Sequence, residues 1–220
     1  RAIFYTSGRT VNESAFLFGL FVRMFGTNNL PDCSNMCHES SGAALDASVG
    51  VGKGTVTLHD IEVADTILVV GQNPGTNHPR MLSTLQAATR NGGEVIAVNP
   101  MKEAGLIGFA HPQEITGMMG ASSPLASQFL RVKINGDFAL FQGLCKSVLE
   151  LEAESPGTVI DSAFIEAETS GYESFAARTA AVGWAEIEER SALNREEIGR
   201  VARTIVRGEK RLITCWAMGL

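Results

Sequence analysis

Two cysteines and a histidine within six residues form the most reactive group of side chains in the sequence. Cys33 and Cys37 are four positions apart, and His38 follows directly. Without a second pair of ligands, this spacing does not make a tetrahedral zinc site. Cys37 could be a single soft ligand to a metal whose other ligands come from a cofactor, or a nucleophilic thiolate assisted by the neighbouring imidazole. A third interpretation is that both cysteines only fill space.

The other histidines and cysteines show no such spacing. His59 and His111 have no partner at a ligand-like separation along the chain, and we interpret them as ordinary polar residues. Cys145 lies on the apolar face of a predicted helix and Cys215 in a predicted strand, so core packing accounts for both.

A glycine-rich segment, Gly50–Thr55, resembles a phosphate-binding P-loop only in part. The P-loop pattern has a glycine five residues before the glycine of its Gly-Lys pair, and a serine or threonine directly after the lysine. Ala47 and Gly54 occupy these two positions, so the pattern fails twice. We therefore predict a flexible turn rather than a phosphate site.

Polar loops follow two predicted strands, which is where parallel α/β sheets bind their ligands. The apolar run Thr66–Val70 predicts a strand buried on both faces, and Glu94–Val98 predicts the next one, with a helix from Pro79 to Arg90 between them. The polar residues are also ordinary turn formers, which is the alternative interpretation. The candidate nucleotide-binding residues are Gly71, Asn73, Gly75, Thr76, Asn77 and His78 after the first strand, Asn99 and Pro100 after the second, and Asp137 before a later helix.

The remaining pattern predicts an α/β chain with Rossmann-like layers of mostly parallel sheet, flanking helices, and no linker that cuts it into independent domains. Thr10 and Glu13 have the spacing of a capping box, so we expect a helix from Thr10 that ends near Gly26. Residues 103–128 lack periodicity and are predicted to be a long surface excursion. The other expected elements are strands at 2–6, 129–134 and 211–216, helices at 39–49, 137–150 and 194–208, and mixed short helices over 152–193.

Composition and charge exclude several classes of protein. The 220 residues are 45% hydrophobic and 19% charged, and a net charge of −6 argues against nucleic acid and anionic membranes as main partners. No run of apolar residues is long enough for membrane insertion. Four cysteines suit a reducing compartment, so we expect a cytoplasmic location. The chain opens at Arg1 rather than Met and stops after an apolar run, which favours an excised fragment of a longer polypeptide.

A series of short motifs resembles the molybdopterin oxidoreductase family, which comprises the catalytic subunits of formate dehydrogenases, periplasmic nitrate reductases and their relatives. The resemblance covers essentially all 220 residues, and within the family it is to the formate-dehydrogenase-like branch that carries Cys-His in its active-site loop. In chain order, the motifs are Tyr5–Glu13, Gly26–Asn29, Cys33–His38, Gly71–Pro79, Asn99-Pro100, Asn135–Asp137 and Trp216–Gly219.

The resemblance implies a fold, a cofactor and a metal ligand. The fold would be part of the multi-domain formate dehydrogenase/DMSO reductase architecture, and the cofactor would be molybdenum or tungsten held by two molybdopterin guanine dinucleotides. Cys37 stands where the family has the cysteine or selenocysteine that ligates the metal, and His38 where formate dehydrogenases have their active-site histidine. Both are thus predicted catalytic residues. The ligands of an expected [4Fe–4S] cluster would precede Arg1, outside this chain.

The polar loops would hold the cofactor's dinucleotides. On this resemblance the residues that would meet phosphate and ribose are Gly71, Asn73, Gly75 and His78. Asn99 and Asp137 would approach guanine or ribose. The family usually has an aspartate where this chain has Asn99. The cofactor-binding residues that the resemblance implies are Arg9, Asn12, Gly71, Asn73, Gly75, Thr76, His78, Asn99, Pro100, Asp137 and Gly219.

The activity implied by the resemblance is two-electron oxidation of formate to carbon dioxide. Related sites act on nitrate, sulfoxides and other small oxo-anions, so the substrate, the metal, the electron acceptor and the oligomeric state stay open. This segment alone is expected to be inactive. One alternative is a non-catalytic nucleotide-binding module, whose affinity would survive Cys37→Ser. Another is a thiol redox protein with a reversible disulfide between Cys33 and Cys37.

Overall fold

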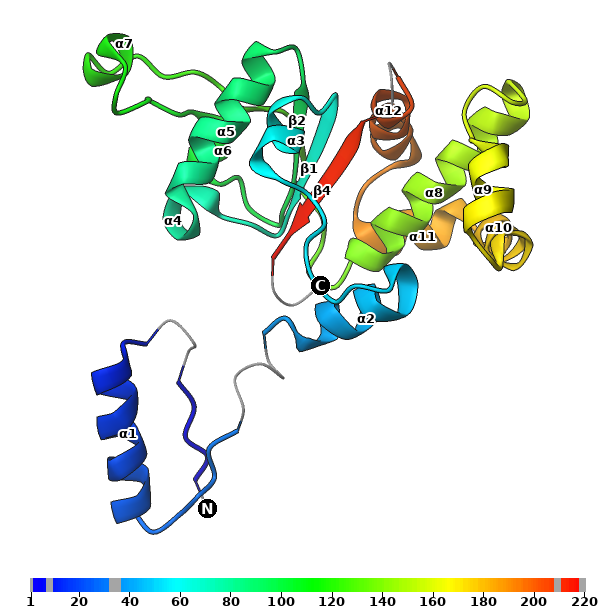
Figure 1. Ribbon diagram of the computed structural model, residues 1–220. Helices are drawn as coiled ribbons and strands as arrows, with labels where there is room; N and C mark the ends of the chain where they lie inside the picture. Colours follow the sequence, from blue (N-terminus) through cyan, green and yellow to red (C-terminus); the bar gives the residue numbers. More distant parts are fainter. Residues whose placement is uncertain (1, 7–9, 32–36, 208–210, 218–220) are drawn as a thin grey trace. The chain divides into compact units, whose positions relative to one another are not determined.

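The computed structural model describes residues 2–6, 10–31, 37–207 and 211–217, which form two compact units (Figure 1). Unit 1 contains the residues up to Thr55, and unit 2 runs from Val56 to Ala217. The division falls just after the glycine turn at 50–54, where the sequence analysis expected no boundary. These turn residues are all exposed, so the chain contributes no core packing there.

Two helices, α1 (Asn12–Met24) and α2 (Glu39–Val49), form most of unit 1, and α2 has the predicted bounds. The capping box expected at Thr10 is wrong. The helix begins two residues later, after Val11, without a side-chain cap, because the Thr10 hydroxyl pairs with that of Thr6 at 2.6 Å instead. At the other end Gly26 has a φ of +90° and donates its N–H to the carbonyl of Arg23, which confirms it as the residue that ends α1.

The predicted strand at 2–6 is also wrong. These residues are extended, but in this part of the chain the backbone bond from Phe4 N–H to the Asn29 carbonyl, at 2.9 Å, has no neighbours that would continue it as a ladder. The segment is held mainly by the Phe4 ring, which meets the rings of Phe18, Phe21 and Phe25 edge-on at centroid distances of 5.1–6.2 Å. The apolar run at the start of the chain therefore reflects packing of Phe4 against a helix and not a strand.

A four-stranded parallel sheet is the centre of unit 2, which confirms the predicted α/β fold. Its strands are β1 (Thr66–Val70), β2 (Glu94–Val98), β3 (Ala126–Leu130) and β4 (Leu212–Trp216), in the spatial order β3-β2-β1-β4. β1 is buried along its whole length, as its uninterrupted apolar sequence predicts.

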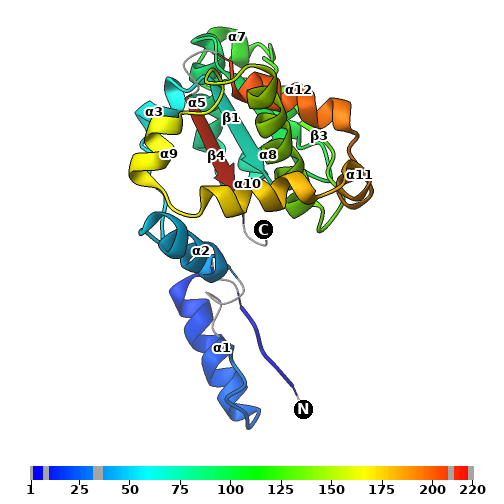
Figure 2. The same cartoon turned by 90° about the vertical axis from the view of Figure 1, so that its right-hand side faces the viewer.

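Helices cover both faces of the sheet. On one face Ile67 and Val69 pack with Leu85 of α5, and on the other Leu68 packs with Leu140 of α8 and Ile198 of α12. Figure 1 shows α5 and α6 on one side of the strands with α8, α11 and α12 on the other, and Figure 2 looks onto the face that α8 and α12 cover. The helices of unit 2 are α3 (Leu58–Glu62), α4 (Pro74–Asn77), α5 (Pro79–Arg90), α6 (Ala104–Ile107), α7 (Ile115–Met118), α8 (Asp137–Glu154), α9 (Ser162–Glu168), α10 (Tyr172–Ala181), α11 (Trp184–Ser191) and α12 (Arg195–Ile205).

The sequence predicted that the segment 103–128 is a surface excursion, but part of this segment lies in the core. Both of its ends lie in the core, through Leu106 and Leu125, which are almost fully buried. Phe109 and Ser123 pair as an antiparallel bridge, and the residues between them carry the exposed helix α7. Strand β3 starts at Ala126 rather than at residue 129, because Leu125 and Ala126 pack into the core on the α5 face.

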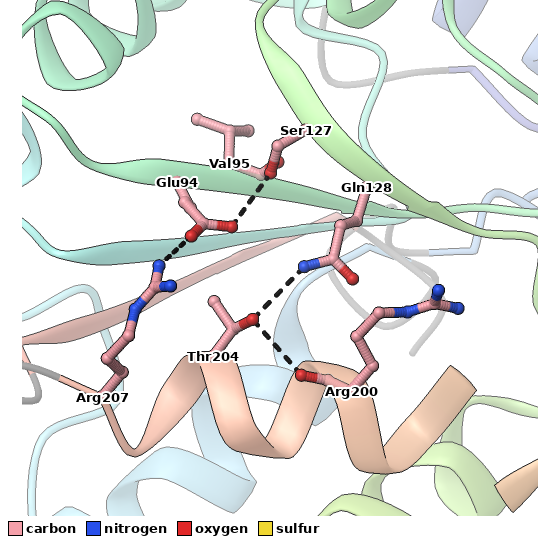
Figure 3. Close-up of polar contacts among 7 residues, drawn as sticks. All are labelled: Glu94, Val95, Ser127, Gln128, Arg200, Thr204 and Arg207. Carbon is pink, nitrogen blue, oxygen red and sulfur yellow. Dashed lines mark hydrogen bonds and ion pairs between the residues drawn. The ribbon is translucent and has the colours of Figure 1, made fainter. Parts of the chain in front are cut away.

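Polar side chains fix α12 near the amino-terminal edge of the sheet (Figure 3). Gln128 donates its amide N–H to the Thr204 hydroxyl at 3.3 Å, and Arg207 forms an ion pair with Glu94 at the start of β2. The helix begins where predicted, after Asn194, which forms a capping box with Glu197. The polar loops lie at the opposite edge of the sheet, where the strands have their carboxyl ends.

Candidate cofactor site

The strand order defines a switch point at the carboxyl edge of the sheet. Connections from β1 to β2 and from β2 to β3 use α5 and α6 on one face, whereas the connection from β3 to β4 uses α8, α11 and α12 on the other. The order therefore reverses between β1 and β4, and ligands of open α/β sheets bind beside such a reversal. The loops that follow these two strands begin at Gly71 and Ala217.

Backbone bonds hold the two loops of the switch point close to the sheet. Gly71 has a φ of +63° and donates its N–H to the Val98 carbonyl at 2.8 Å, while Ala217 donates to the Val70 carbonyl at 3.0 Å. A side chain on residue 71 would therefore be strained. Gly71 is exposed at this edge, as its predicted role as a cofactor contact requires.

Gln72 joins the two loops, and it is a residue that sequence reasoning missed. Its Nε2 donates to the Trp216 carbonyl at 3.2 Å, across the switch point. Its Oε1 is buried and accepts no hydrogen bond from any residue that the structure describes. A buried polar atom without a partner is rare in folded proteins and indicates a missing one. The signal in the sequence was its position, two residues after the end of β1.

The next residues of this loop have structural roles in the protein itself. Asn73 caps α4, with its side-chain oxygen accepting from the Thr76 N–H at 3.2 Å. Gly75 lets α4 approach α6, since a Cβ on it would lie 3.4 Å from Gly105 Cα. Gly75, Thr76 and His78 are nevertheless exposed at the carboxyl edge, where a ligand could reach them.

Asn99, predicted to approach guanine or ribose, uses its side chain inside the protein. Its Nδ2 donates to the Gln72 carbonyl at 3.3 Å and lies 3.5 Å from a carboxylate oxygen of Glu103, and its Oδ1 accepts from the Met101 N–H at 3.3 Å. The amide thus links the loops after β1 and β2. Pro100, which follows it, is exposed.

Asp137 is the first residue of α8, as predicted, and is partly buried. Burial raises the pKa of its carboxyl, although a hydrogen bond from its own backbone N–H opposes the shift. Gly136 before it was missed: a Cβ there would lie 2.7 Å from the Arg190 carbonyl oxygen and 2.8 Å from that of Lys133. A glycine is therefore required for α8 to begin where it does.

In unit 1, Cys37 and His38 form the turn that leads into α2. Cys37 is partly buried, and His38 is exposed as the residue before the first turn. The His38 Nδ1 lies 3.4 Å from the Ser41 hydroxyl, and its carbonyl accepts the N–H of Gly42 at 2.8 Å. Asn12, another predicted contact, is exposed at the start of α1.

Three predicted residues, Arg9, Cys33 and Gly219, lie outside the described residues. Within the described ranges, no group of three or more His, Cys, Asp or Glu side chains could hold a metal ion by itself. Burial raises the pKa of the Cys145 and Cys215 thiols, in agreement with their interpretation as packed residues.

A family model for molybdopterin oxidoreductases matches residues 1–189, which is most of the chain. The chain belongs to the molybdopterin oxidoreductase family. It is similar along its whole length to an uncharacterized oxidoreductase of Mycobacterium tuberculosis, with 52% identity over 28% of that protein, and to the protein YdeP of Escherichia coli, with 43% identity over 29% of that protein. The chain thus spans less than a third of the curated relatives that it matches.

More distant members of the family include one named for formate. Formate dehydrogenase H of Escherichia coli is 25% identical over 98% of this chain and 27% of its own length. The solved structure of acetylene hydratase from Pelobacter acetylenicus matches 90% of this chain and 24% of its own, with a TM-score of 0.63 and 20% identity. That likeness shows that this molybdopterin oxidoreductase chain has the fold of part of a larger enzyme.

The residues of this molybdopterin oxidoreductase fit the cofactor that its family implies, molybdenum or tungsten with two molybdopterin guanine dinucleotides. A dinucleotide has hydroxyl and ring N–H groups, and the Oε1 of Gln72, which has no described partner, can accept a hydrogen bond from such a group. Thiolate sulfur is a soft ligand of the kind that such metals bind, and Cys37 can supply it. No helix among the described residues has both the length and the apolar character needed to span a bilayer.

Proposed function

We propose that this chain is part of a longer cytoplasmic molybdopterin oxidoreductase that oxidises formate to carbon dioxide, releasing two electrons and a proton. The observation that carries the proposal is the Cys37-His38 pair on the turn before α2, in a member of this family. Its similarity to a formate dehydrogenase supports the choice of substrate. Electrons would leave through an iron–sulfur cluster whose ligands lie outside this chain.

The bound cofactor would supply the two-electron redox chemistry at its metal. The Cys37 thiolate would hold the metal from the turn before α2, where the N-terminal end of the helix favours negative charge. The exposed His38 ring would orient the formate carboxylate or move a proton through one of its nitrogens. Ser41, 3.4 Å from Nδ1, would help to orient the ring so that Nε2 faces the substrate.

The carboxyl edge of unit 2 would bind a guanine dinucleotide. Gly71, Gly75, Thr76 and His78 are exposed there, and the Gly75 N–H lies in the first turn of α4, where backbone N–H groups have no partner within the helix. Phosphate oxygens are the acceptors that such N–H groups suit. Asp137 would accept a hydrogen bond from a guanine or ribose donor.

The test compares the full-length protein with Cys37→Ser and a matched Cys145→Ser variant, all produced with molybdate and tungstate supplied. Cys145 is the control because it is a partly buried cysteine on α8, in a packing role. Metal content, guanine nucleotide content and formate-dependent reduction of an artificial electron acceptor are measured. We expect about two guanine nucleotides per metal ion in wild type, and a loss of formate oxidation of at least about 100-fold in Cys37→Ser alone.

Each other outcome contradicts a stated part of the proposal. A wild-type protein with neither metal nor guanine nucleotide refutes the oxidoreductase role. Guanine nucleotide without metal favours the nucleotide-binding module. Metal and nucleotide with no formate oxidation show that the substrate is a different small molecule. Equal activity of Cys37→Ser and Cys145→Ser refutes the role of Cys37.

A further inference from the structure

We propose that Gln72, and not Asn99, is the side chain that recognises the nucleoside at the carboxyl edge, by accepting a hydrogen bond from an N–H or O–H group of guanosine. This inference rests on the proposed function, because guanosine is the nucleoside of the implied cofactor. It assigns a direct role to a residue of the Gly71–Pro79 motif that is not among the predicted cofactor-binding residues.

The unpartnered oxygen is the first observation. Gln72 Oε1 is enclosed by protein and receives no hydrogen bond from the described residues. Among these residues it is the one buried side-chain oxygen or nitrogen atom without a hydrogen-bond partner. Leaving such an acceptor unpaired costs free energy that a folded protein normally avoids. The atom lies beside the reversal of strand order, where ligands of this fold class bind.

The second observation is that this oxygen is held in place from two sides. The Gln72 side chain is tied to β4 by the bond from Nε2 to the Trp216 carbonyl, at 3.2 Å. Its backbone carbonyl is tied to the end of β2 by the Asn99 amide, at 3.3 Å. The end of β4 and the loop after β2 therefore fix the direction of one acceptor before any ligand arrives, which lowers the entropy cost of binding.

The chemistry of this atom selects the group that it can bind. An amide oxygen accepts and does not donate, so it cannot pair with a phosphate oxygen at neutral pH. Guanosine offers the ring N1–H, the 2-amino group and the ribose hydroxyls as donors. The Asn99 side chain is already committed to Gln72, Glu103 and Met101, so it acts as a positioning residue for Gln72.

The test uses the full-length holoprotein as wild type, Gln72→Met and Gln128→Met. Methionine keeps the length and flexibility of glutamine and removes its polar atoms. Gln128 is the matched control because it is a partly buried glutamine whose Nε2 also makes one 3.3 Å hydrogen bond, to Thr204 on the face of α12. The measured quantity is the rate at which guanine nucleotide leaves the holoprotein on dilution, with the unfolding midpoint recorded for each variant.

We expect guanine nucleotide to leave Gln72→Met about tenfold faster than wild type, the effect of one hydrogen bond to a ligand, and to leave Gln128→Met at the wild-type rate. Equal rates for Gln72→Met and wild type, when wild type carries the nucleotide, refute this inference and leave the proposed function intact. A wild-type protein without guanine nucleotide refutes both together.

A second measurement, on wild-type protein and Gln72→Met produced without cofactor, distinguishes the donors by comparing the affinities of several probes within each protein. The probes are GDP, IDP, which lacks the 2-amino group, and 2′-deoxy-GDP and 3′-deoxy-GDP, which each lack one ribose hydroxyl. A roughly tenfold weaker affinity for one analogue, absent in Gln72→Met, identifies that group as the partner. Equal affinity for all four probes, with weaker GDP binding by Gln72→Met, identifies N1–H. Equal affinities of wild type and Gln72→Met for every probe refute the inference.

Discussion

Gly136 sets the start of α8 and thereby the position of Asp137 at the carboxyl edge, so Gly136→Ala tests how closely this corner is packed. A Cβ at this position would lie 2.7 Å from the Arg190 carbonyl oxygen, 2.8 Å from that of Lys133 and 3.1 Å from Ser191 Cα. All three are backbone atoms, which cannot rotate away. The backbone itself would tolerate alanine, since Gly136 has a φ of −97° and a ψ of −5°. Any destabilisation must therefore come from the added methyl group.

The expected size of the effect follows from a matched glycine. Gly183 also precedes the first turn of a helix, α11, without a side-chain cap, but a Cβ there meets nothing within 4 Å. Alanine is a poorer residue than glycine in this position, so each substitution costs about 0.5–1 kcal/mol for that reason. Overpacking adds about 1–3 kcal/mol at Gly136 alone. We expect Gly136→Ala to lose about 1.5–4 kcal/mol and Gly183→Ala no more than about 1 kcal/mol.

Urea unfolding, followed by tryptophan fluorescence, measures both losses. Trp184 is a suitable probe because it packs against the core on the α8 face and its Nε1 donates to Glu150 of α8 at 2.9 Å. An equal loss of stability in Gly136→Ala and Gly183→Ala would refute the reasoning, since the two positions differ in their surroundings. The same result would remove the argument that Gly136 positions Asp137.

Two further predictions concern the start of the sheet and the loop after β1. Asp65→Asn is expected to lower the thermal midpoint most near neutral pH, because hydrogen bonds from Arg211 hold the pKa of the Asp65 carboxyl below its ordinary value of 3.8. The ion pair therefore stabilises the folded state above pH 3.8, and this stabilisation is lost as the pH falls through the lower folded-state pKa. A difference in thermal midpoint between wild type and Asp65→Asn that stays constant from pH 7 to about pH 2 would contradict this prediction. Gly105→Ala is expected to cost about 1–3 kcal/mol in urea unfolding, because its Cβ would lie 3.1 Å from Gly75 Cα, whereas Gly75→Ala, at 3.4 Å, should cost less. If a phosphate approaches Gly75, Gly75→Ala should still lose guanine nucleotide. Equal stability of Gly105→Ala and Gly75→Ala would contradict the argument that a Cβ on Gly105 is too close to Gly75.

The central elements were predictable because local sequence determined them. The run Thr66–Val70 is apolar without interruption, and Pro79 and the glycines at 92 and 93 bound the helix that follows it, so β1, α5 and β2 have the predicted limits. The start of α12 was predictable in the same way, since Asn194 and Glu197 do form a capping box, although the helix ends at Ile205 rather than at residue 208. In each case a short stretch of chain contains both the signal and the groups that satisfy it.

Elements whose signal depended on a distant partner were predicted wrongly. Thr10 and Glu13 have capping-box spacing, but the Thr6 hydroxyl competes for Thr10. Residues 2–6 have the pattern of a strand, yet their described neighbour is the aromatic face of α1 rather than a second strand. The start of β3 depends on how Ala126 meets β2, where the register shifts between Val95 and Ile96. Sequence pattern contains none of these contacts.

For the candidate site, the sequence predicted where the polar residues lie but not which of them binds the ligand. Parallel strands predict that polar residues after β1 and β2 share one edge, and the structure has Gln72 and Asn99 within hydrogen-bond distance there. The hydrogen bonds that each of the two amides makes inside the protein decide which of them can bind a ligand. The Asn99 donors and acceptor have partners inside the protein, whereas Gln72 keeps one enclosed acceptor without a described partner. An amide can recognise a ligand only with an atom that has no hydrogen-bond partner inside the protein, so we assign recognition to the glutamine and not to the asparagine that holds it in place.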